Sequence, residues 1–203
     1  LTIDSGREPP FMRAKLVSRV LDFDDLAGFI GATPQTGQGE TASAAQKKAA
    51  REGEQGGRIL PDMPIDLDRL KAMNMDVDFT GAEIKAPNLP LERLHAALKL
   101  DKGVLTFQPL EFGVADGEIG GTLVLDGRQS LPHVKADLLL RGISLKPFFA
   151  ETRMADFTSG RFGGRITLVG DGRSLADVLG TSNGQTTVAM TGGSLSPLLV
   201  ELI

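Results

Sequence analysis

The sequence predicts a mainly β protein, in which an antiparallel meander forms a curved sheet with an apolar inner face and short capping helices. Three observations lead to this fold class: short runs of alternating apolar and polar residues, glycine-containing turn pairs between those runs, and a recurring apolar phrase. Alternation with period two is typical of strands that bury one side, and turn pairs between such runs favour hairpins. The sequence therefore predicts strands that add one after another to a single sheet.

The recurring phrase consists of two apolar residues at the end of a strand, followed by a hook of three apolar residues. Its three copies are Ala14, Leu16, Leu21, Phe23 and Leu26; Ala82, Ile84, Leu89, Leu91 and Leu94; and Ala136, Leu138, Ile143, Leu145 and Phe148. Repeated units of this kind bury their faces against their neighbours. We expect each hook to cover part of the apolar face that its strand helps to form.

The chain divides into three parts by composition. Residues 1–31 predict a strand-helix piece of the same β body, with strands at 2–4 and 12–19 and a short helix up to Gly31. Residues 32–58 contain no Val, Ile, Leu, Met or Phe, so they cannot bury enough apolar surface to offset the entropy of ordering. They predict a flexible linker or loop, and residues 59–203 predict an antiparallel β domain with short helices.

Within 59–203, alternating runs mark strands over 94–100, 105–107, 110–114, 119–125, 136–140, 161–169 and 185–190. Lys102-Gly103, Asp116-Gly117 and Asp126-Gly127 are turn pairs, because hairpin turns need residues that tolerate positive φ. Ser174 begins a short helix that ends at Gly180. A last apolar run, 196–203, predicts a helix, and the start at Leu1 suggests a portion of a longer protein.

The alternation places apolar side chains on one side of the predicted sheet. The residues that we expect to face that side, and to face lipid if the side is open, are Leu98, Leu100, Leu105, Phe107, Phe112, Leu123, Leu125, Leu138 and Leu140. A sheet with one apolar side must pack that side on something. Two alternatives follow from the residues alone: a closed sandwich core, or a curled sheet with a groove for an apolar ligand.

The residues give no sign of catalysis, of a cofactor or of a metal. The net charge of −4 provides no basic surface for nucleic acid, and there is no cysteine for a disulfide or a thiolate site. His95 and His133 have no second ligand at metal-binding spacing, and the clustered aspartates lack the calcium-loop pattern. We therefore predict that the protein is not an enzyme and binds no nucleic acid.

Several phrases, in order, resemble the AsmA family. They are Leu89 to Leu94, Leu98 to Phe107, Pro109 to Gly121, Gly160 to Leu168 and Met190 to Ser196. The resemblance implies a Gram-negative envelope protein with an N-terminal inner-membrane anchor, outside this chain, and a periplasmic β-rich body with an apolar groove. It carries over no catalytic residue.

Two functions follow as expectations. The first is a non-enzymatic periplasmic module for outer-membrane biogenesis that binds or transfers phospholipid-like acyl chains along its apolar β-surface. The second is a scaffold that binds another envelope protein without carrying lipid. The residues favour the first because an apolar surface recognises acyl chains by burial alone.

Overall fold

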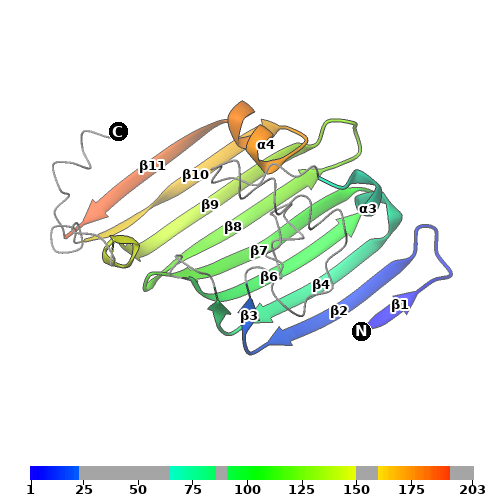
Figure 1. Ribbon diagram of the computed structural model, residues 1–203, viewed down its shortest axis with the longest axis horizontal. Coiled ribbons are helices and arrows are strands. Elements are labelled where there is room, and N and C mark those ends of the chain that lie inside the picture. The colour runs from blue at the N-terminus through cyan, green and yellow to red at the C-terminus, as the bar shows by residue number, and fades with distance from the viewer. Residues whose placement is uncertain (23–64, 86–90, 150–159, 193–203) are drawn as a thin grey trace, which may run out of the picture.

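The computed structural model describes residues 1–22, 65–85, 91–149 and 160–192, which form one curved, nine-stranded sheet (Figure 1). The order across the sheet is β1-β2-β4-β6-β7-β8-β9-β10-β11. The bounds are β1 (Thr2–Asp4), β2 (Phe11–Ser18), β4 (Asn74–Gly81), β6 (Leu91–Asp101), β7 (Val104–Val114), β8 (Gly117–Asp126), β9 (His133–Ser144), β10 (Arg161–Asp171) and β11 (Asn183–Thr191). The predicted fold class, a mainly β curved sheet with short helices, is confirmed.

The sheet is an antiparallel meander from β4 to β11, as predicted, but one pair departs from that pattern. Strand β2 runs parallel to β4, with Phe11 opposite Asn74 and Ser18 opposite Gly81. A parallel pair needs a crossover of a dozen or more residues, and residues 19–73 connect the two strands. This long connection allows β2 and β4 to run parallel, whereas a tight turn between them would have made them antiparallel.

Strand β7 corrects the prediction of two separate strands at 105–107 and 110–114. It is one strand whose register shifts between Phe107 and Leu110 against β8. Pro109 falls inside this irregularity. Proline cannot donate to the ladder and is accepted within a sheet where a bulge leaves its position unpaired. The strand therefore continues through the proline.

The turn between β7 and β8 also differs from the prediction. Ala115 and Asp116 have the positive φ values of 47° and 60°, so they are the turn residues, and Gly117 already belongs to β8. Gly117 is required for close approach, because an added Cβ would lie 2.6 Å from the Arg141 carbonyl oxygen. The predicted Lys102-Gly103 turn is confirmed, with both residues at positive φ.

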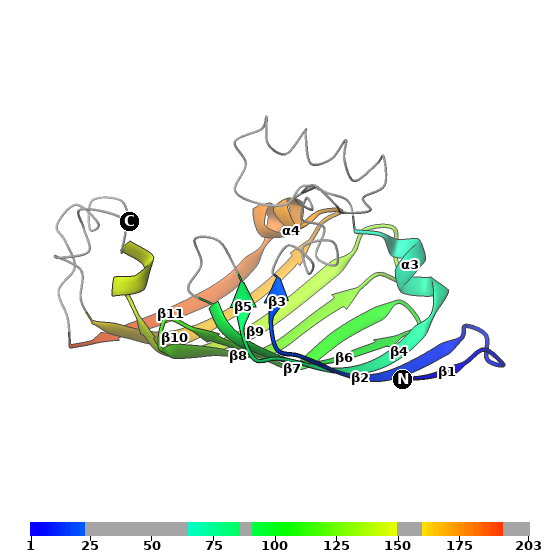
Figure 2. The same cartoon turned by 60° about the horizontal axis from the view of Figure 1, so that its bottom comes forward.

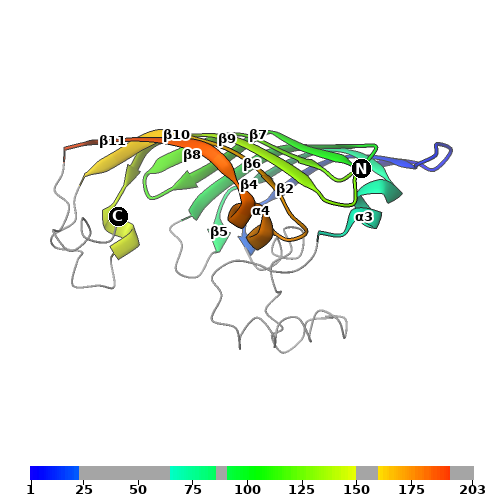
Figure 3. The same cartoon turned by 90° about the horizontal axis from the view of Figure 1, so that it is seen from above.

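All the smaller elements lie on one side of the sheet, the concave side (Figures 2 and 3). They are a parallel pair of short strands, β3 (Leu21–Asp22) with β5 (Ile84–Lys85), and the helices α3 (Leu67–Ala72), η1 (Lys146–Phe149) and α4 (Leu175–Thr181). The predicted start of α4 is confirmed, since the Ser174 hydroxyl accepts the Asp177 backbone N–H at 3.1 Å. Helix α3 was not predicted, and Asp68 lies in its first turn.

The buried residues form two clusters on this concave side. The first contains Leu21, Ile84, Leu94 and Ala96, so that β3 and β5 pack directly on β6. The second contains Val114, Ala115, Leu140 and Ile143. The first hook therefore begins as expected, with Leu21 buried against the face, whereas Ile143 of the third hook is buried but still belongs to the main strand β9.

The prediction of the second hook is wrong in one respect. Leu91 and Leu94 do not cover the face but belong to the main strand β6, and Ile84 in β5 packs over the face instead. The predicted repeat matched Ala14 with Ala82 and Leu21 with Leu89. In the structure Ala14 instead lies opposite Val77, and Leu21 lies opposite Ile84. The repeated unit is thus a long strand followed by a short one. The long strands β2 and β4 pair in parallel with each other, and so do the short strands β3 and β5. The helix predicted before Gly31, the linker at 32–58 and the helix at 196–203 lie outside the described residues.

Candidate functional site

The candidate site is the concave face of the sheet, and the strand register defines it. Residues directly opposite each other in neighbouring strands share a face. One row runs across five strands through Leu98, Phe107, Leu123, Ala136 and Leu168. A single face of this sheet is thus apolar from strand to strand.

A second row places Leu100, Leu105, Leu125 and Val134 side by side. The register extends these rows to β2 and β4, where Met12 lies opposite Met75 and Ala14 opposite Val77. The structure brings together on this one face all nine of the residues predicted to share it: Leu98, Leu100, Leu105, Phe107, Phe112, Leu123, Leu125, Leu138 and Leu140.

These nine side chains differ in how far they are covered. Leu100 and Leu140 are buried, with 3% and 9% of their surface exposed. The other seven, among them Leu98, Phe107 and Leu123, are half-buried. Within the described ranges the cover consists of the pair β3–β5 and the short helices, and no second large sheet packs across the face. The sandwich alternative therefore does not apply to the part of the chain that the structure describes.

The prediction omitted several residues of the same face. They are Met12, Ala14, Leu16, Met75, Val77, Phe79, Leu94, Ala96, Leu110, Ile119, Val134, Phe162, Ile166, Leu168, Val188 and Met190. The period-two alternation was the signal that could have found those in β4, where Met75, Val77 and Phe79 alternate with Asp76 and Asp78. The two aspartates therefore lie on the outer face.

The convex face carries the alternate residues, and these form ion pairs between strands. Arg13 on β2 approaches Asp76 on β4 at 3.3 Å, although their side chains are largely exposed. Arg165 on β10 binds Asp137 on β9 through two hydrogen bonds of 2.6 and 2.8 Å. The Arg165 guanidinium holds the pKa of the Asp137 carboxyl below its usual range. The convex face is thus polar and carries ion pairs between neighbouring strands.

Both histidines lie on this polar face. His95 on β6 is 3.1 Å from Glu111 and 3.5 Å from Asp78, in the strands on either side. The hydrogen bond to Glu111, with a further contribution from Asp78, raises the pKa of the His95 imidazole. His133 hydrogen-bonds Asp171 at 2.7 Å. Across the described residues no group of three His, Asp or Glu side chains is arranged to hold a metal ion.

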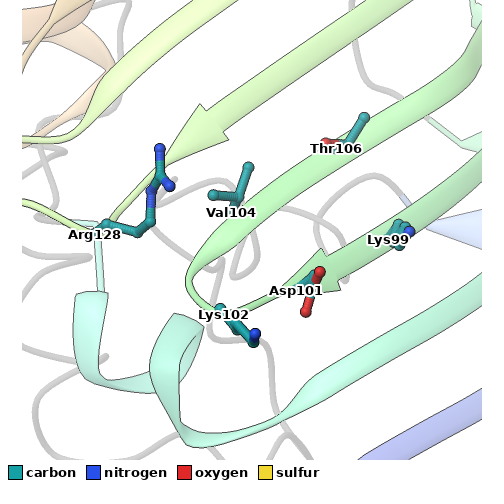
Figure 4. A pocket seen from close by; sticks show the side chains of 6 residues that line it. All are labelled: Lys99, Asp101, Lys102, Val104, Thr106 and Arg128. Carbon is teal, nitrogen blue, oxygen red and sulfur yellow. The ribbon is translucent and has the colours of Figure 1, made fainter.

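A shallow depression on the polar face has a volume of about 290 Å³ (Figure 4). It is lined by Lys99, Asp101, Lys102, Val104, Thr106 and Arg128. Arg128 is bound by Asp126, whose pKa this contact lowers to about 2. Because the depression is shallow and its Arg128 is already paired with Asp126, it is a less convincing site than the concave face.

The fold and the site define a class of one-sided β proteins, with a polar outer face and an apolar inner face that the described residues cover only in part. The chain belongs to the AsmA family, whose model matches residues 1–202. It is 30% identical over its whole length to the AsmA family protein YhjG of Escherichia coli K12, and it spans 30% of the length of that relative. No solved structure matches the chain significantly. Of the helices described here, none is long and apolar enough to cross a membrane.

Proposed function

We propose that this chain is a non-enzymatic module of Gram-negative envelope biogenesis that binds or passes phospholipid-like acyl chains along its concave face. One observation supports this most: the register places apolar side chains of eight neighbouring strands on a single face, which the small elements of the described residues cover only in part. Membership of the AsmA family supports the envelope role. A periplasmic location and an inner-membrane tether belong to the same proposal.

The chemistry of the face suits acyl chains rather than polar ligands. Leu98, Phe107 and Leu123 offer no hydrogen-bonding group, and each methylene that a lipid buries against such side chains contributes about 0.8 kcal/mol. The face is also extended, so neighbouring positions along it are chemically similar. A ligand held by burial alone can shift between such positions without breaking a specific contact.

The charges of the protein leave the lipid head group outside the face. The ion-paired residues, such as Arg13 with Asp76 and Arg165 with Asp137, are on the convex side. A head group brought onto the row of Leu98, Phe107 and Leu123 would lose its hydration without gaining a charged partner within that row, which costs several kcal/mol. The acyl chains would therefore lie along the strands' apolar side with the head group at the rim of the sheet.

The test compares two aspartate substitutions in one strand. Leu123→Asp places a carboxylate on the concave face, and Val124→Asp places it on the convex face, opposite Lys135. Both parent side chains are half-buried, so the two variants differ mainly in the face that they alter. The purified protein is mixed with phosphatidylethanolamine–phosphatidylglycerol vesicles that contain NBD-labelled phosphatidylethanolamine, and the label that leaves with the protein is measured.

We expect the unmodified chain and Val124→Asp to take up the labelled lipid, and Leu123→Asp to lose most of this uptake while its circular dichroism is retained. Absence of uptake by the unmodified chain, or equal uptake by both variants, would contradict the proposal. Unfolding of Leu123→Asp alone would indicate that Leu123 belongs to a closed core. Leu98→Asp then serves as a second variant, since Leu98 lies two strands away in the same row.

A further inference from the structure

One rim of the sheet, where β6 ends and β7 begins, gathers four cations. Lys99, Lys102 and Arg128 line the shallow depression there (Figure 4). Lys71 in α3 joins them, because its Cγ atom and that of Arg128 would lie 3.4 and 3.6 Å from a Cβ added to Gly103 in the β6–β7 turn. We call these four cations the basic rim.

Contacts between three chain segments hold the basic rim in place. The Gly127 backbone N–H donates to the Gly103 carbonyl at 2.8 Å, which ties the turn after β8 to the turn after β6. The Lys102 backbone N–H donates to the Asn74 side chain at 2.8 Å, which ties the same turn to the start of β4. Leu70 of α3 packs on Gly127, where an added Cβ would lie 2.9 Å from its Cδ1 atom. The four cations therefore project from turns that are bound to one another.

The three lysines of the basic rim have no acidic partner among the residues that the structure describes. Asp126 binds Arg128, whereas Asp101, which also lines the depression, makes no ion pair. Asp68, one turn before Lys71 in α3, forms none with it. The four cations together with Asp101 and Asp126 carry a net charge of +2, in a chain whose net charge is −4. A local excess of this kind attracts anions.

The arginines in the main strands of the opposite rim are bound within the sheet. Arg141 lies 3.0 Å from Glu118, and Arg93 lies 3.6 Å from the same carboxylate. Arg161 donates to the Gly142 carbonyl at 3.2 Å. The two rims thus differ, since the basic rim clusters lysines whose ammonium groups are available to an external anion.

The basic rim lies at the ends of interior strands and adjoins the apolar face. The strands that form it lie between β2 and β10, so a strand added to either edge of the sheet would leave these turns where they are. Leu100 follows Lys99 directly in β6. With Leu105 and Leu125 it forms the apolar row nearest to the turns. Cationic and apolar surfaces therefore meet along this rim, as the two parts of a phospholipid require.

We propose that the basic rim binds the phosphates of anionic lipid head groups at a membrane surface. This inference rests on the proposed function and deepens it, because it names the end of the apolar face that meets the bilayer. The depression is shallow and its cations come from separate segments, which suits an array of phosphates better than one enclosed anion. Flexible lysine stems let the ammonium groups follow such a surface, while the adjoining leucines receive the acyl chains.

The test is co-sedimentation of the 203-residue chain with phosphatidylcholine vesicles that contain or lack phosphatidylglycerol. We expect stronger binding to the anionic vesicles, and this binding should weaken as salt is added, because salt screens exposed charges. The double variant Lys71→Gln/Lys102→Gln should lower the partition coefficient roughly tenfold or more, since each lysine near an anionic surface contributes to binding.

The matched control is the double variant Lys15→Gln/Lys85→Gln. It removes the same two charges at exposed sites on β2 and β5, outside the basic rim. The control should change the partition coefficient less than about twofold. Equal effects of the two double variants, or equal binding to both kinds of vesicle, would overturn the proposal.

The uptake of labelled lipid separates this inference from the proposed function. Uptake by the unmodified chain without lysine-dependent vesicle binding overturns the basic rim as a membrane contact and leaves lipid carriage intact. Lysine-dependent vesicle binding without uptake supports the basic rim and contradicts lipid carriage alone.

Discussion

The concave and convex faces of the sheet are made of alternate residues of the same strands, and they differ in what they contribute. The concave face contains the two buried clusters, for example Leu94 with Ala96 and Leu140 with Ile143. The convex face contains exposed ion pairs such as Arg165 with Asp137. Burial of apolar surface outweighs exposed ion pairs in most proteins, so the concave face should carry most of the stability. It is also the proposed lipid surface, and the same side chains therefore serve both purposes.

Neighbouring glycines in β8 show the same difference in backbone packing. A Cβ added to Gly121 would lie 2.0 Å from the Asp137 carbonyl oxygen, whereas one added to Gly120 meets atoms only at 3.7 Å and beyond. Gly121 is opposite Leu110 and Leu138 in the apolar rows, and Gly120 belongs to the convex set. The curvature of the sheet thus restricts the backbone at concave positions more than at convex ones.

The largest effect that we expect comes from this pair of glycines. Gly121→Ala should lower the free energy of unfolding by about 3 kcal/mol or more, because the backbone of β9 must move to accommodate the methyl group. Gly120→Ala should be neutral or slightly stabilising, since it restricts the unfolded chain without a clash. Urea denaturation of both variants measures the difference, and equal losses would show that the two faces are not distinct in this respect.

A smaller difference is expected from two adjacent leucines in β9. Leu140→Ala should cost about 2 kcal/mol, because it leaves a cavity among Val114, Ala115 and Ile143. Leu139, on the convex face, is 38% exposed, so Leu139→Ala should change the free energy of unfolding by less than about 0.5 kcal/mol. Thermal and urea unfolding measure both, and a larger loss for Leu139→Ala would reverse our assignment of the core.

On the convex face, Arg165→Gln should raise the pKa of Asp137 toward its usual value by removing the guanidinium that lowers it. A carboxyl whose pKa is lowered by folding contributes stability above its unfolded pKa, and this contribution is lost as the pH falls through the folded value. The variant should therefore lose less stability than the unmodified chain on acidification. Carbon-detected NMR titration measures the pKa, and Arg141→Gln, which affects Glu118 instead, is the control that should leave Asp137 unchanged.

The smallest effect concerns His95. Its pKa is raised mainly by Glu111, so Glu111→Gln should lower it toward 6.5. A histidine whose pKa is raised by folding contributes stability below its unfolded pKa, and this contribution disappears as the pH rises through the folded value. Because His95 is well exposed, the effect on unfolding should be small. Proton NMR titration of the imidazole measures the shift, and an unchanged pKa in Glu111→Gln would mean that this contact is not formed in solution.

The strand residues that alternate regularly were predictable, and the places where the backbone departs from regularity were not. The alternation of Leu123 with Val124 is enough to assign opposite faces. In contrast, separate strands were predicted at 105–107 and 110–114, yet the bulge in β7 accepts Pro109 within one strand. Leu21 was predicted as the first residue of a covering hook, and it lies in a short strand because Ile84 offers it a parallel partner. That partner is far away in sequence, and local patterns carry no information about it.

By itself, the sequence determined that the protein is mainly β, that one side of its strands is apolar, and which leucines and phenylalanines share that side. These properties depend on the period of the side chains, which any local stretch of the chain displays. Only the tertiary structure decided that β2 is parallel to β4 and that, in the described part of the chain, short elements cover a single curved sheet only in part. These properties depend on which segments that are distant in sequence pack against each other. The free energy that favours one set of such contacts comes from packing across the whole sheet.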